Sequence, residues 1–222
     1  MDSVVHACED LTEEHIARLE KLQESLAILA DFSRADVIMY CPLNPERAVV
    51  AAQFRPHSIL PIYEQSLVGR QVGFADEPEV MRALTEGHRG FSEVRRRIGK
   101  RRSPAEGAPT VRETYPICDA EGKIIAAVCI ETNLIERERH RRRSKVFQRS
   151  LRQFQQMVLA GQLRGVGDLT SFAEHDGVMV LDAQHRIQYI SGIATSMYRK
   201  LGYAGDLLKR YVEDLEPDDN SL

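Results

Sequence analysis

Two segments of the chain repeat apolar residues at the spacing of a single helical face. In the segment from Thr12 to Asp31 the steps are three, four and three residues, at Leu19, Leu22, Leu26 and Leu29. In the segment from about Glu136 to Ala160 they are four, three and four, at Phe147, Leu151, Phe154 and Val158. We predict two long helices, the first capped by Thr12 and the second ended by Gly161.

Each of these narrow apolar faces allows two interpretations. They can pair between two copies of the chain, so that the long helices of a parallel homodimer pack into a bundle. Alternatively, they can cover one face of the chain's own sheet. The pattern favours neither interpretation over the other.

Between the two helices the pattern changes to short apolar runs rich in β-branched residues. These runs predict strands at Asp36–Cys41, Ala48–Phe54, Val111–Cys118 and Lys123–Glu131. The last two form a hairpin around Gly122, and one short helix, capped by Asp76 and ended by Gly87, interrupts the strands. This order indicates an α+β fold with antiparallel strands.

A second, smaller unit follows the Gly-rich linker Gly161–Asp168. Gly177–Asp182 and Arg186–Ile190 flank a tight polar turn, which predicts another hairpin. Helices are expected at Ile193–Leu201 and Leu207–Tyr211. About 50 residues make a small independent domain, so we expect this unit to be cut short and the chain to be a fragment.

Charge is segregated along the chain although the formal net charge is only −3. Arg95–Arg102 and Arg137–Lys145 each contain six cations. We interpret the first block as a solvated loop, with an anion contact as the sharper alternative. The second block begins a helix, where the helix dipole disfavours cations. We expect acids of the first helix to compensate it, within one chain or between subunits: Glu9, Asp10, Glu13 and Glu14.

Motifs for catalysis and for metal binding are missing from the sequence. It has no phosphate-binding loop, no G-x-S-x-G nucleophile elbow and no HExxH zinc pair. Its four cysteines lack CxxC spacing and are expected to be reduced thiols of a cytosolic protein. No apolar run approaches the roughly 20 residues that span a bilayer. We therefore expect a cytoplasmic, non-catalytic chain, with no metal site, no membrane association and no identifiable cofactor.

A small-molecule pocket is predicted between the sheet and the loop Arg55–Phe74. Ligand pockets combine aromatic walls with a few polar groups that orient the ligand. Seven residues in or near these elements fit that description: Tyr40, Phe54, Arg55, Tyr63, Arg70, Arg112 and Tyr115.

Several short stretches resemble the N-terminal sensory region of cytosolic sensor histidine kinases. They include the runs beginning at Leu29, Gln53, Ser66, Glu79 and Met157, which read LADFSRAD, QFRPHS, SLVGR, EVMRALTEG and MVLAG. Asp176–Asp182 (DGVMVLD) with Ile187–Ile190 (IQYI) looks like the opening of a PAS domain. In that family a GAF-like domain comes first, a PAS domain follows and a kinase domain closes the chain.

The resemblance implies a GAF-like antiparallel sheet flanked by two long helices, followed by a partial PAS-like α/β unit. The expected divisions are an N-terminal helix (1–35), a GAF-like domain (36–135), a signalling helix and linker (136–165) and a PAS-like unit (166–222). A kinase domain beyond residue 222 would transfer phosphate from ATP, with a response regulator as its partner. At the position of a common PAS asparagine this chain has Ser191-Gly192.

The main rival is a GAF-type transcription regulator that binds nucleic acid through its basic segments. Such a protein needs a recognition helix or a surface where cations alternate with aromatic residues. Neither pattern is present in the sequence, so nucleic acid is not the expected partner. A free-standing enzyme ranks third because no motif supports it.

Overall fold

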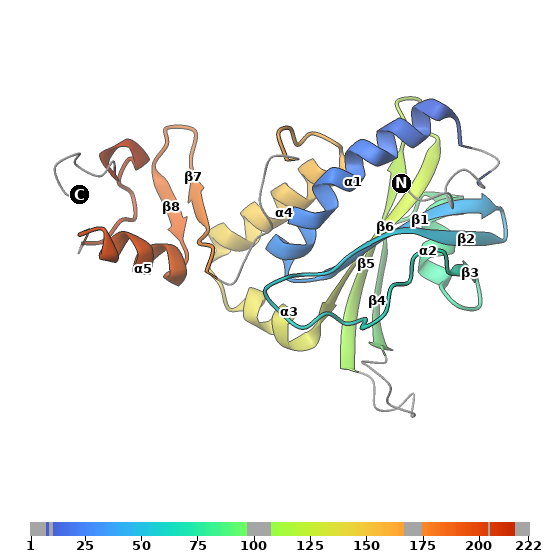
Figure 1. The fold of residues 1–222 in the computed structure, drawn as a ribbon, viewed down its shortest axis with the longest axis horizontal. Coiled ribbons are helices and arrows are strands. Elements are labelled where there is room, and N and C mark those ends of the chain that lie inside the picture. Colours follow the sequence, from blue (N-terminus) through green and yellow to red (C-terminus); the bar gives the residue numbers. More distant parts are fainter. Residues whose placement is uncertain (1–7, 9–10, 97–107, 167–174, 204, 216–222) are drawn as a thin grey trace.

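The structure, a computed structural model, describes residue 8 and residues 11–96, 108–166, 175–203 and 205–215. A curled antiparallel sheet of six strands lies at its centre, in the order β3-β2-β1-β6-β5-β4 (Figure 1). The strands are β1 (Asp36–Asn44), β2 (Arg47–Phe54), β3 (Gln71–Gly73), β4 (Gly90–Arg96), β5 (Ala108–Cys118) and β6 (Ile124–Asn133). The predicted α+β fold and all four predicted strands are confirmed.

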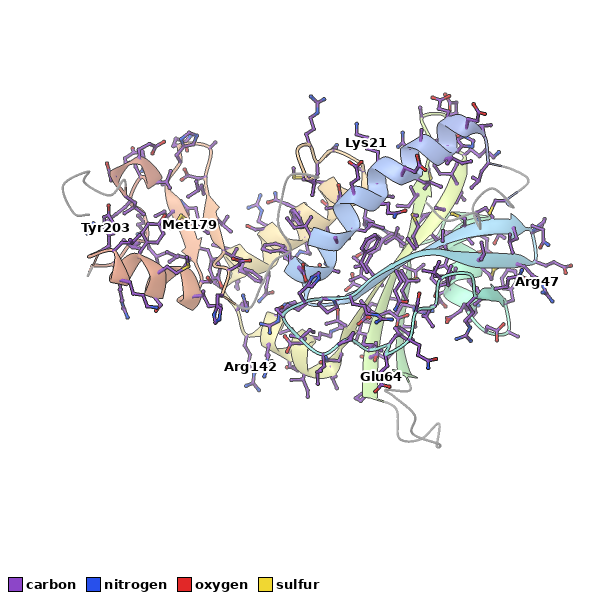
Figure 2. The ribbon with its side chains drawn as sticks, viewed as in Figure 1. Lys21, Arg47, Glu64, Arg142, Met179 and Tyr203 are labelled. Carbon is purple, nitrogen blue, oxygen red and sulfur yellow. The ribbon has the colours of Figure 1, made fainter. Side chains whose placement is uncertain are left out.

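Helix α1 (Glu13–Ser33) covers one face of this sheet. Thr12 caps it as predicted, because its side chain accepts a hydrogen bond from His15 N at 3.3 Å. The four seam leucines are at most 3% exposed and pack in one core with side chains of β1, β2 and β6. This apolar face of α1 therefore covers the chain's own sheet, which is the second of the two interpretations. Charged side chains such as Lys21 of α1 and Arg47 of β2 lie outside this core (Figure 2).

The predicted long helix from Glu136 to Ala160 is wrong in one respect, since two helices occupy this range. Helix α3 (Leu134–Arg141) ends at Arg142, and helix α4 (Lys145–Leu159) begins after Ser144. The Ser144 side chain accepts a hydrogen bond from Phe147 N at 3.2 Å and thereby caps a new helix. Helix α4 then runs beside α1 on the same face of the sheet (Figure 1).

The opposite face of the sheet is covered by helix α2 (Pro78–Glu86) and by the loop between β2 and β3. Gly87 ends α2 in the left-handed conformation, as predicted, with φ of 71°. The predicted cap at Asp76 is wrong, because the N-cap residue is Glu77. The Asp76 carboxylate instead accepts a hydrogen bond from Gly73 N at 3.3 Å and so closes the preceding turn.

The C-terminal unit contains the predicted hairpin, formed by β7 (Met179–Leu181) and β8 (Ile187–Ile190), followed by helix α5 (Gly192–Lys200). The predicted helix at Leu207–Tyr211 is wrong. Lys209 has a φ of 67°, which does not fit a right-handed helix, and Tyr211 pairs with Arg186 as a β-bridge. A 3-10 turn, η3 (Val212–Leu215), follows instead.

Two sequence predictions fall partly outside the described residues. Arg95 and Arg96 end strand β4, but the rest of the basic block Arg95–Arg102 lies outside the described part of the chain. The same holds for the last two residues of the linker Gly161–Asp168. Among the described helices, none has the length and apolar character needed to cross a membrane.

Candidate functional site

A buried ion-pair network occupies the α2 side of the sheet, where the sequence predicts a ligand pocket. Arg112 on β5 and Glu131 on β6 are direct cross-strand partners, and they are 2% and 0% exposed. Arg112 Nε donates to Glu131 Oε1 at 2.7 Å, and its other nitrogens pair with Glu77 and Glu131. Tyr63 OH donates to the second oxygen of Glu131 at 2.8 Å. Arg112 thus joins two strands and the start of α2, and Glu131 links them to the overlying loop through Tyr63.

Asp36, at the start of β1, holds the same loop against the sheet. Its Oδ2 accepts a hydrogen bond from Ile62 N at 2.7 Å, and the side chain is buried. Burial, supported by the nearby charge of Glu131, raises the pKa of Asp36 to about 6. On β2, Gln53 Oε1 accepts from Leu67 N at 2.7 Å. These hydrogen bonds hold the loop against the sheet at the place where the sequence predicts a ligand pocket.

The structure brings together only part of the predicted pocket. Tyr40, Tyr63 and Arg112 lie on the α2 side, where Tyr40 and Arg112 are at most 2% exposed. Phe54 and Tyr115 pack against the core on the opposite face. The other two predicted residues lie at the periphery: Arg55 is half-buried with its charge near Asp36, and Arg70 is exposed.

The carboxylates of the network were missed by the sequence reasoning. Glu131 ends the apolar strand run KIIAAVCIE, and Glu77 precedes the proline that begins α2. A charged residue at the edge of an apolar run is usually solvated, and the sequence does not show which arginine lies across from it. The cross-strand register of β5 and β6 supplies that information.

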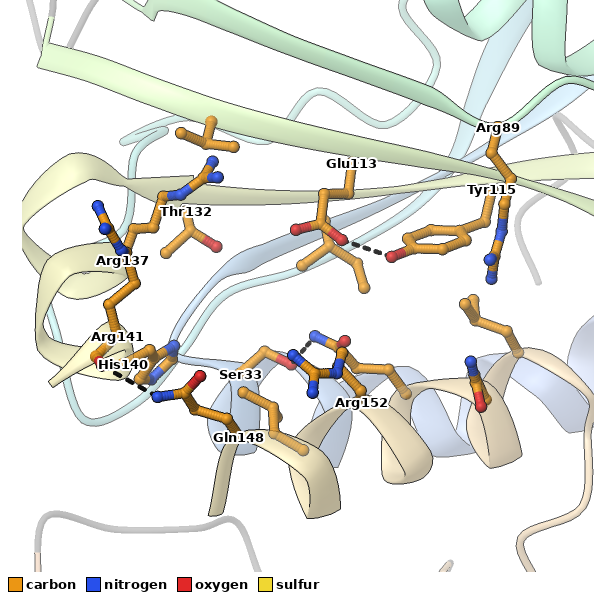
Figure 3. Close-up of a pocket in the computed structure, with 16 residues that line it drawn as sticks. Ser33, Arg89, Glu113, Tyr115, Thr132, Arg137, His140, Arg141, Gln148 and Arg152 are labelled. Carbon is orange, nitrogen blue, oxygen red and sulfur yellow. Dashed lines mark hydrogen bonds between the residues drawn. The ribbon is translucent and has the colours of Figure 1, made fainter. Parts of the chain in front are cut away.

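A cavity of about 320 Å³ lies on the other face of the sheet, between strands β5 and β6 and helices α3 and α4 (Figure 3). Its wall contains Ser33, Arg89, Val111, Glu113, Tyr115, Ile130, Thr132, Arg137, His140, Arg141, Gln148, Leu151, Arg152, Gln155, Gln156 and Leu159. Figure 3 shows Glu113 and Thr132 on the strand side, facing Gln148 and Arg152 on the helical side. Helices α1 and α4 therefore leave a hollow over part of the sheet.

Four arginines and one glutamate give this cavity an excess of positive charge. Glu113 accepts a hydrogen bond from the Tyr115 hydroxyl, and the Arg89 guanidinium lies 4.6 Å from the centre of the same ring. Burial, reinforced by the nearby Arg143, lowers the pKa of His140 to about 4, so this imidazole is neutral at pH 7. No group of three His, Cys, Asp or Glu side chains suited to a metal ion occurs among the described residues.

The basic segment Arg137–Lys145 obtains its negative partners locally. Glu136, 3% exposed, pairs with Arg139 and, at 3.0 Å, with Arg34 at the end of α1. Arg141 pairs with Glu138 at 2.8 Å. Of the acids that we expected to compensate this segment, Glu13 and Glu14 lie in the described part of the chain, and no ion pair joins them to it. The prediction is therefore wrong for Glu13 and Glu14 within one chain, Glu9 and Asp10 lie outside the described residues, and the version between subunits stays a prediction.

Phe147, at the start of α4, joins the two units of the chain. Its ring centre lies 5.8 Å from that of Phe32 on α1 and 5.1 Å from that of Tyr189 on β8. We call this contact of Phe147 with Phe32 and Tyr189 the aromatic joint. Arg143 adds to it, because its guanidinium lies 4.6 Å from the Phe147 ring centre and donates to Tyr189 OH at 3.4 Å. The first turn of α4 is thus the place where the large sheet unit and the C-terminal hairpin meet.

A curled antiparallel sheet with helices α1 and α4 on one face and a helix and long loop on the other defines a sensory domain of the GAF class. The family model of the histidine kinase PdtaS GAF domain matches residues 1–150. The chain belongs to this family, and it is a sensory GAF domain of the histidine kinase type.

Two known proteins show how far this relationship extends. The sensor histidine kinase PdtaS of Mycolicibacterium smegmatis (strain ATCC 700084 / mc(2)155) is 24% identical over 184 residues, which cover 81% of this chain and 36% of that protein. The chain therefore spans about a third of the length of this curated relative. The solved sensor region of a sensor histidine kinase overlays with a TM-score of 0.65 at 20% identity, covering 97% of this chain and 74% of the other. This overlay confirms the predicted fold.

Transcription regulators of the rival class match more weakly. An IclR-type regulator from Alicyclobacillus acidocaldarius overlays with a TM-score of 0.40 at 11% identity, covering 74% of this chain and 71% of the other. A likeness at that level carries no argument about function. The family match therefore leaves the transcription-regulator interpretation unfavoured.

Proposed function

We propose that this chain is the signal-input region of a cytoplasmic two-component histidine kinase. In this proposal, residues 36–135 form the sensor, residues 136–165 carry the signal, and residues 166–222 are the opening of a PAS-like domain. The chain acts as a homodimer and controls a kinase domain that phosphorylates a response regulator. The family match and the relative's kinase activity support this role.

The aromatic joint at Phe147 is the observation that carries the proposal. A signal that shifts α4 against the sheet changes the contact of Phe147 with Phe32 on one side and with Tyr189 on the other. Packed interfaces of this kind have few stable arrangements, so a small shift at one end becomes a discrete change at the other. To act as a switch, a ligand must favour one arrangement by a few kcal/mol.

Replacing the corresponding sensory region of the M. smegmatis relative with this chain tests the proposal. The chimera is expected to phosphorylate itself from ATP. We expect Tyr189→Ala, which weakens the joint from the hairpin side, to change the basal rate several-fold. Met157→Ala is the matched control, because Met157 lies on α4, is 43% exposed and belongs to neither core cluster.

Tyr189 is the better test position because Phe147 is 2% exposed, and its truncation would also leave a cavity. A thermal melt of each variant of the isolated chain shows whether the sheet unit remains folded. If Tyr189→Ala and Met157→Ala have the same autophosphorylation rate as the unmodified chimera, α4 does not relay a signal. A folded chimera that does not phosphorylate itself also counts against the proposed role.

A further inference from the structure

Two polar atoms on the wall of the cavity in Figure 3 lack partners. Arg137 Nη1 and His140 Nε2 are buried from solvent, and neither has a hydrogen-bond partner among the described residues. Buried polar groups are nearly always hydrogen-bonded in native proteins, and leaving one unpaired costs free energy. Both residues belong to α3, one turn apart, on the helix that lines this end of the cavity, and the Arg137 guanidinium lies 4.9 Å from the centre of the Phe91 ring.

The charge of the cavity indicates the chemistry of that partner. Within the described residues, Arg89, Arg137 and Arg152 have no carboxylate at ion-pair distance, whereas Arg141 is held by Glu138. Glu113, the one carboxylate on the wall, already accepts from Tyr115. A guanidinium pairs best with a carboxylate or a phosphate, which accept two of its N–H groups at once.

We propose that this cavity binds a small anion carrying carboxylate or phosphate groups. Thr132 and Gln156 add polar side chains to the wall, whereas Gln148 and Gln155 already donate to Arg141 O, Arg143 O and Ser33 Oγ. A volume of about 320 Å³ is at the lower end of the range for ligand pockets, so it suits a compact metabolite. The site lies on the α1 and α4 side of the sheet, opposite the network that closes the α2 side.

The position of the cavity connects it with the joint at Phe147. Its wall is built from β5 and β6 on one side and from α3 and α4 on the other, so a bound anion bridges the sheet and the helices. Such a bridge favours one position of α4 over others. A role for this site as the input of a kinase rests on the proposed function. Anion binding by itself does not depend on that function.

Isothermal titration calorimetry of the 222-residue chain tests the site. The probes are inorganic phosphate and citrate, each at constant ionic strength adjusted with sodium chloride. We expect at least one probe to bind saturably, with one site per chain. Arg137→Gln should weaken that binding at least tenfold, because it removes a charge-assisted hydrogen bond. Arg149→Gln is the matched control, since Arg149 is an exposed cation of α4 that does not line the cavity.

A second variant keeps the test valid if Arg137→Gln does not fold. Arg152 is exposed and lines the same cavity, so Arg152→Gln should weaken binding without loss of structure. Binding of phosphate alone assigns the site to phosphate-bearing ligands, and binding of citrate alone assigns it to carboxylates. Lack of saturation by either probe at about 10 mM, or equal weakening by Arg137→Gln and Arg149→Gln, would overturn the proposal.

Autophosphorylation of the chimera, measured with and without the bound probe, separates this inference from the proposed function. Saturable binding with no change in the rate supports the anion site and counts against its role as a signal input. If Tyr189→Ala changes the autophosphorylation rate but neither probe binds, the anion site is overturned and the proposed function stays in place.

Discussion

Arg112 and Glu131 face each other across β5 and β6, and the Arg112 side chain donates to Glu131 Oε1 at 2.7 Å in the interior of the domain. Glu77 brings a second carboxylate to the same guanidinium. The Tyr63 hydroxyl of the covering loop donates to the second oxygen of Glu131. The protein's own charges therefore occupy the α2 side around Arg112, and the cavity of about 320 Å³ lies on the other face.

Replacing Arg112 by methionine is expected to destabilise the domain strongly. The substitution leaves two buried carboxylates without their cation, and breaking a buried ion pair in this way costs about 3–5 kcal/mol. Urea unfolding, followed by circular dichroism, measures the change in the free energy of unfolding. Arg47→Met, on an exposed position of β2, is the control and should change it by less than about 0.5 kcal/mol.

The double variant Arg112→Met/Glu131→Gln shows whether the loss comes from uncompensated charge. Removing the Glu131 charge together with its cation should recover part of the stability lost in Arg112→Met. An Arg112→Met protein within about 1 kcal/mol of the unmodified chain would show that the network contributes little.

The sequence predicts the elements whose signals are local and misses those that depend on distant partners. The seam of α1 and the glycine turn at Gly122 are visible because helical period and turn chemistry act within a few residues. The break before α4 is missed, because Ser144 fits a helix until its capping role is known. Edge strands β3 and β4 are missed because they alternate weakly and depend on their neighbours for pairing.

The candidate site is less predictable than the fold, because its contacts join residues that are far apart in the sequence. The predicted pocket residues Tyr40, Tyr63 and Arg112 lie on one face, but the carboxylates that bind Tyr63 and Arg112 come from other elements. The cavity on the opposite face is formed by α3 and α4 together, so it depends on the bend between them.

Opposite pKa shifts at Asp36 and His140 predict opposite pH dependences in single variants. The pKa of Asp36 is raised to about 6 in the folded state, so its contribution lowers stability as pH rises from about 4 to 6. Burial lowers the pKa of His140 to about 4, so its contribution lowers stability as pH falls from about 6.5 to 4. Each change in pKa corresponds to roughly 3 kcal/mol at most, and the two contributions largely cancel in the unmodified chain.

Asp36→Asn and His140→Gln should reveal these two contributions separately. In Asp36→Asn the His140 contribution remains, so stability should rise with pH between about 4 and 6 relative to the unmodified chain. In His140→Gln it should fall with pH over the same interval. Urea unfolding at pH 4.5, 5.5 and 6.5, chosen within about that interval, gives the slopes. If the free energy of unfolding changes with pH in the same way in all three proteins, the raised pKa of Asp36 and the lowered pKa of His140 are contradicted.

Leu26 distinguishes packing against the chain's own sheet from packing in a dimer bundle. It is 0% exposed in the core that α1 shares with the sheet, so Leu26→Ala should cost about 2–5 kcal/mol. Leu60→Ala is the control, because Leu60 is 88% exposed, and the expected change is within about 0.5 kcal/mol. Unfolding at two protein concentrations completes the test: a cost for Leu26→Ala that depends on concentration would show that a partner chain covers this residue.

Gly177 is expected to be essential for the contact between the C-terminal hairpin and α5. A Cβ atom at Gly177 would lie 2.5 Å from the Ala194 Cβ and 2.8 Å from Ala194 N, which no native packing allows. Ser191 Oγ accepts hydrogen bonds from Val178 N at 3.0 Å and from Ala194 N at 3.2 Å in the same place. Gly177→Ala should therefore push α5 away and break these bonds, at a cost of about 1–3 kcal/mol.

Gly192→Ala is the matched control, because a Cβ atom there meets nothing within 4 Å and alanine favours the helix that begins at this residue. Hydrogen exchange measures the effect locally, since the C-terminal unit has its own small core around Ile187 and can open without the large sheet. We expect faster exchange at β7, β8 and α5 in Gly177→Ala and unchanged exchange in α1 and β6. Equal protection in both glycine variants would mean that α5 moves freely enough to accept a methyl group, and the contact would then be too loose to transmit a change in α4.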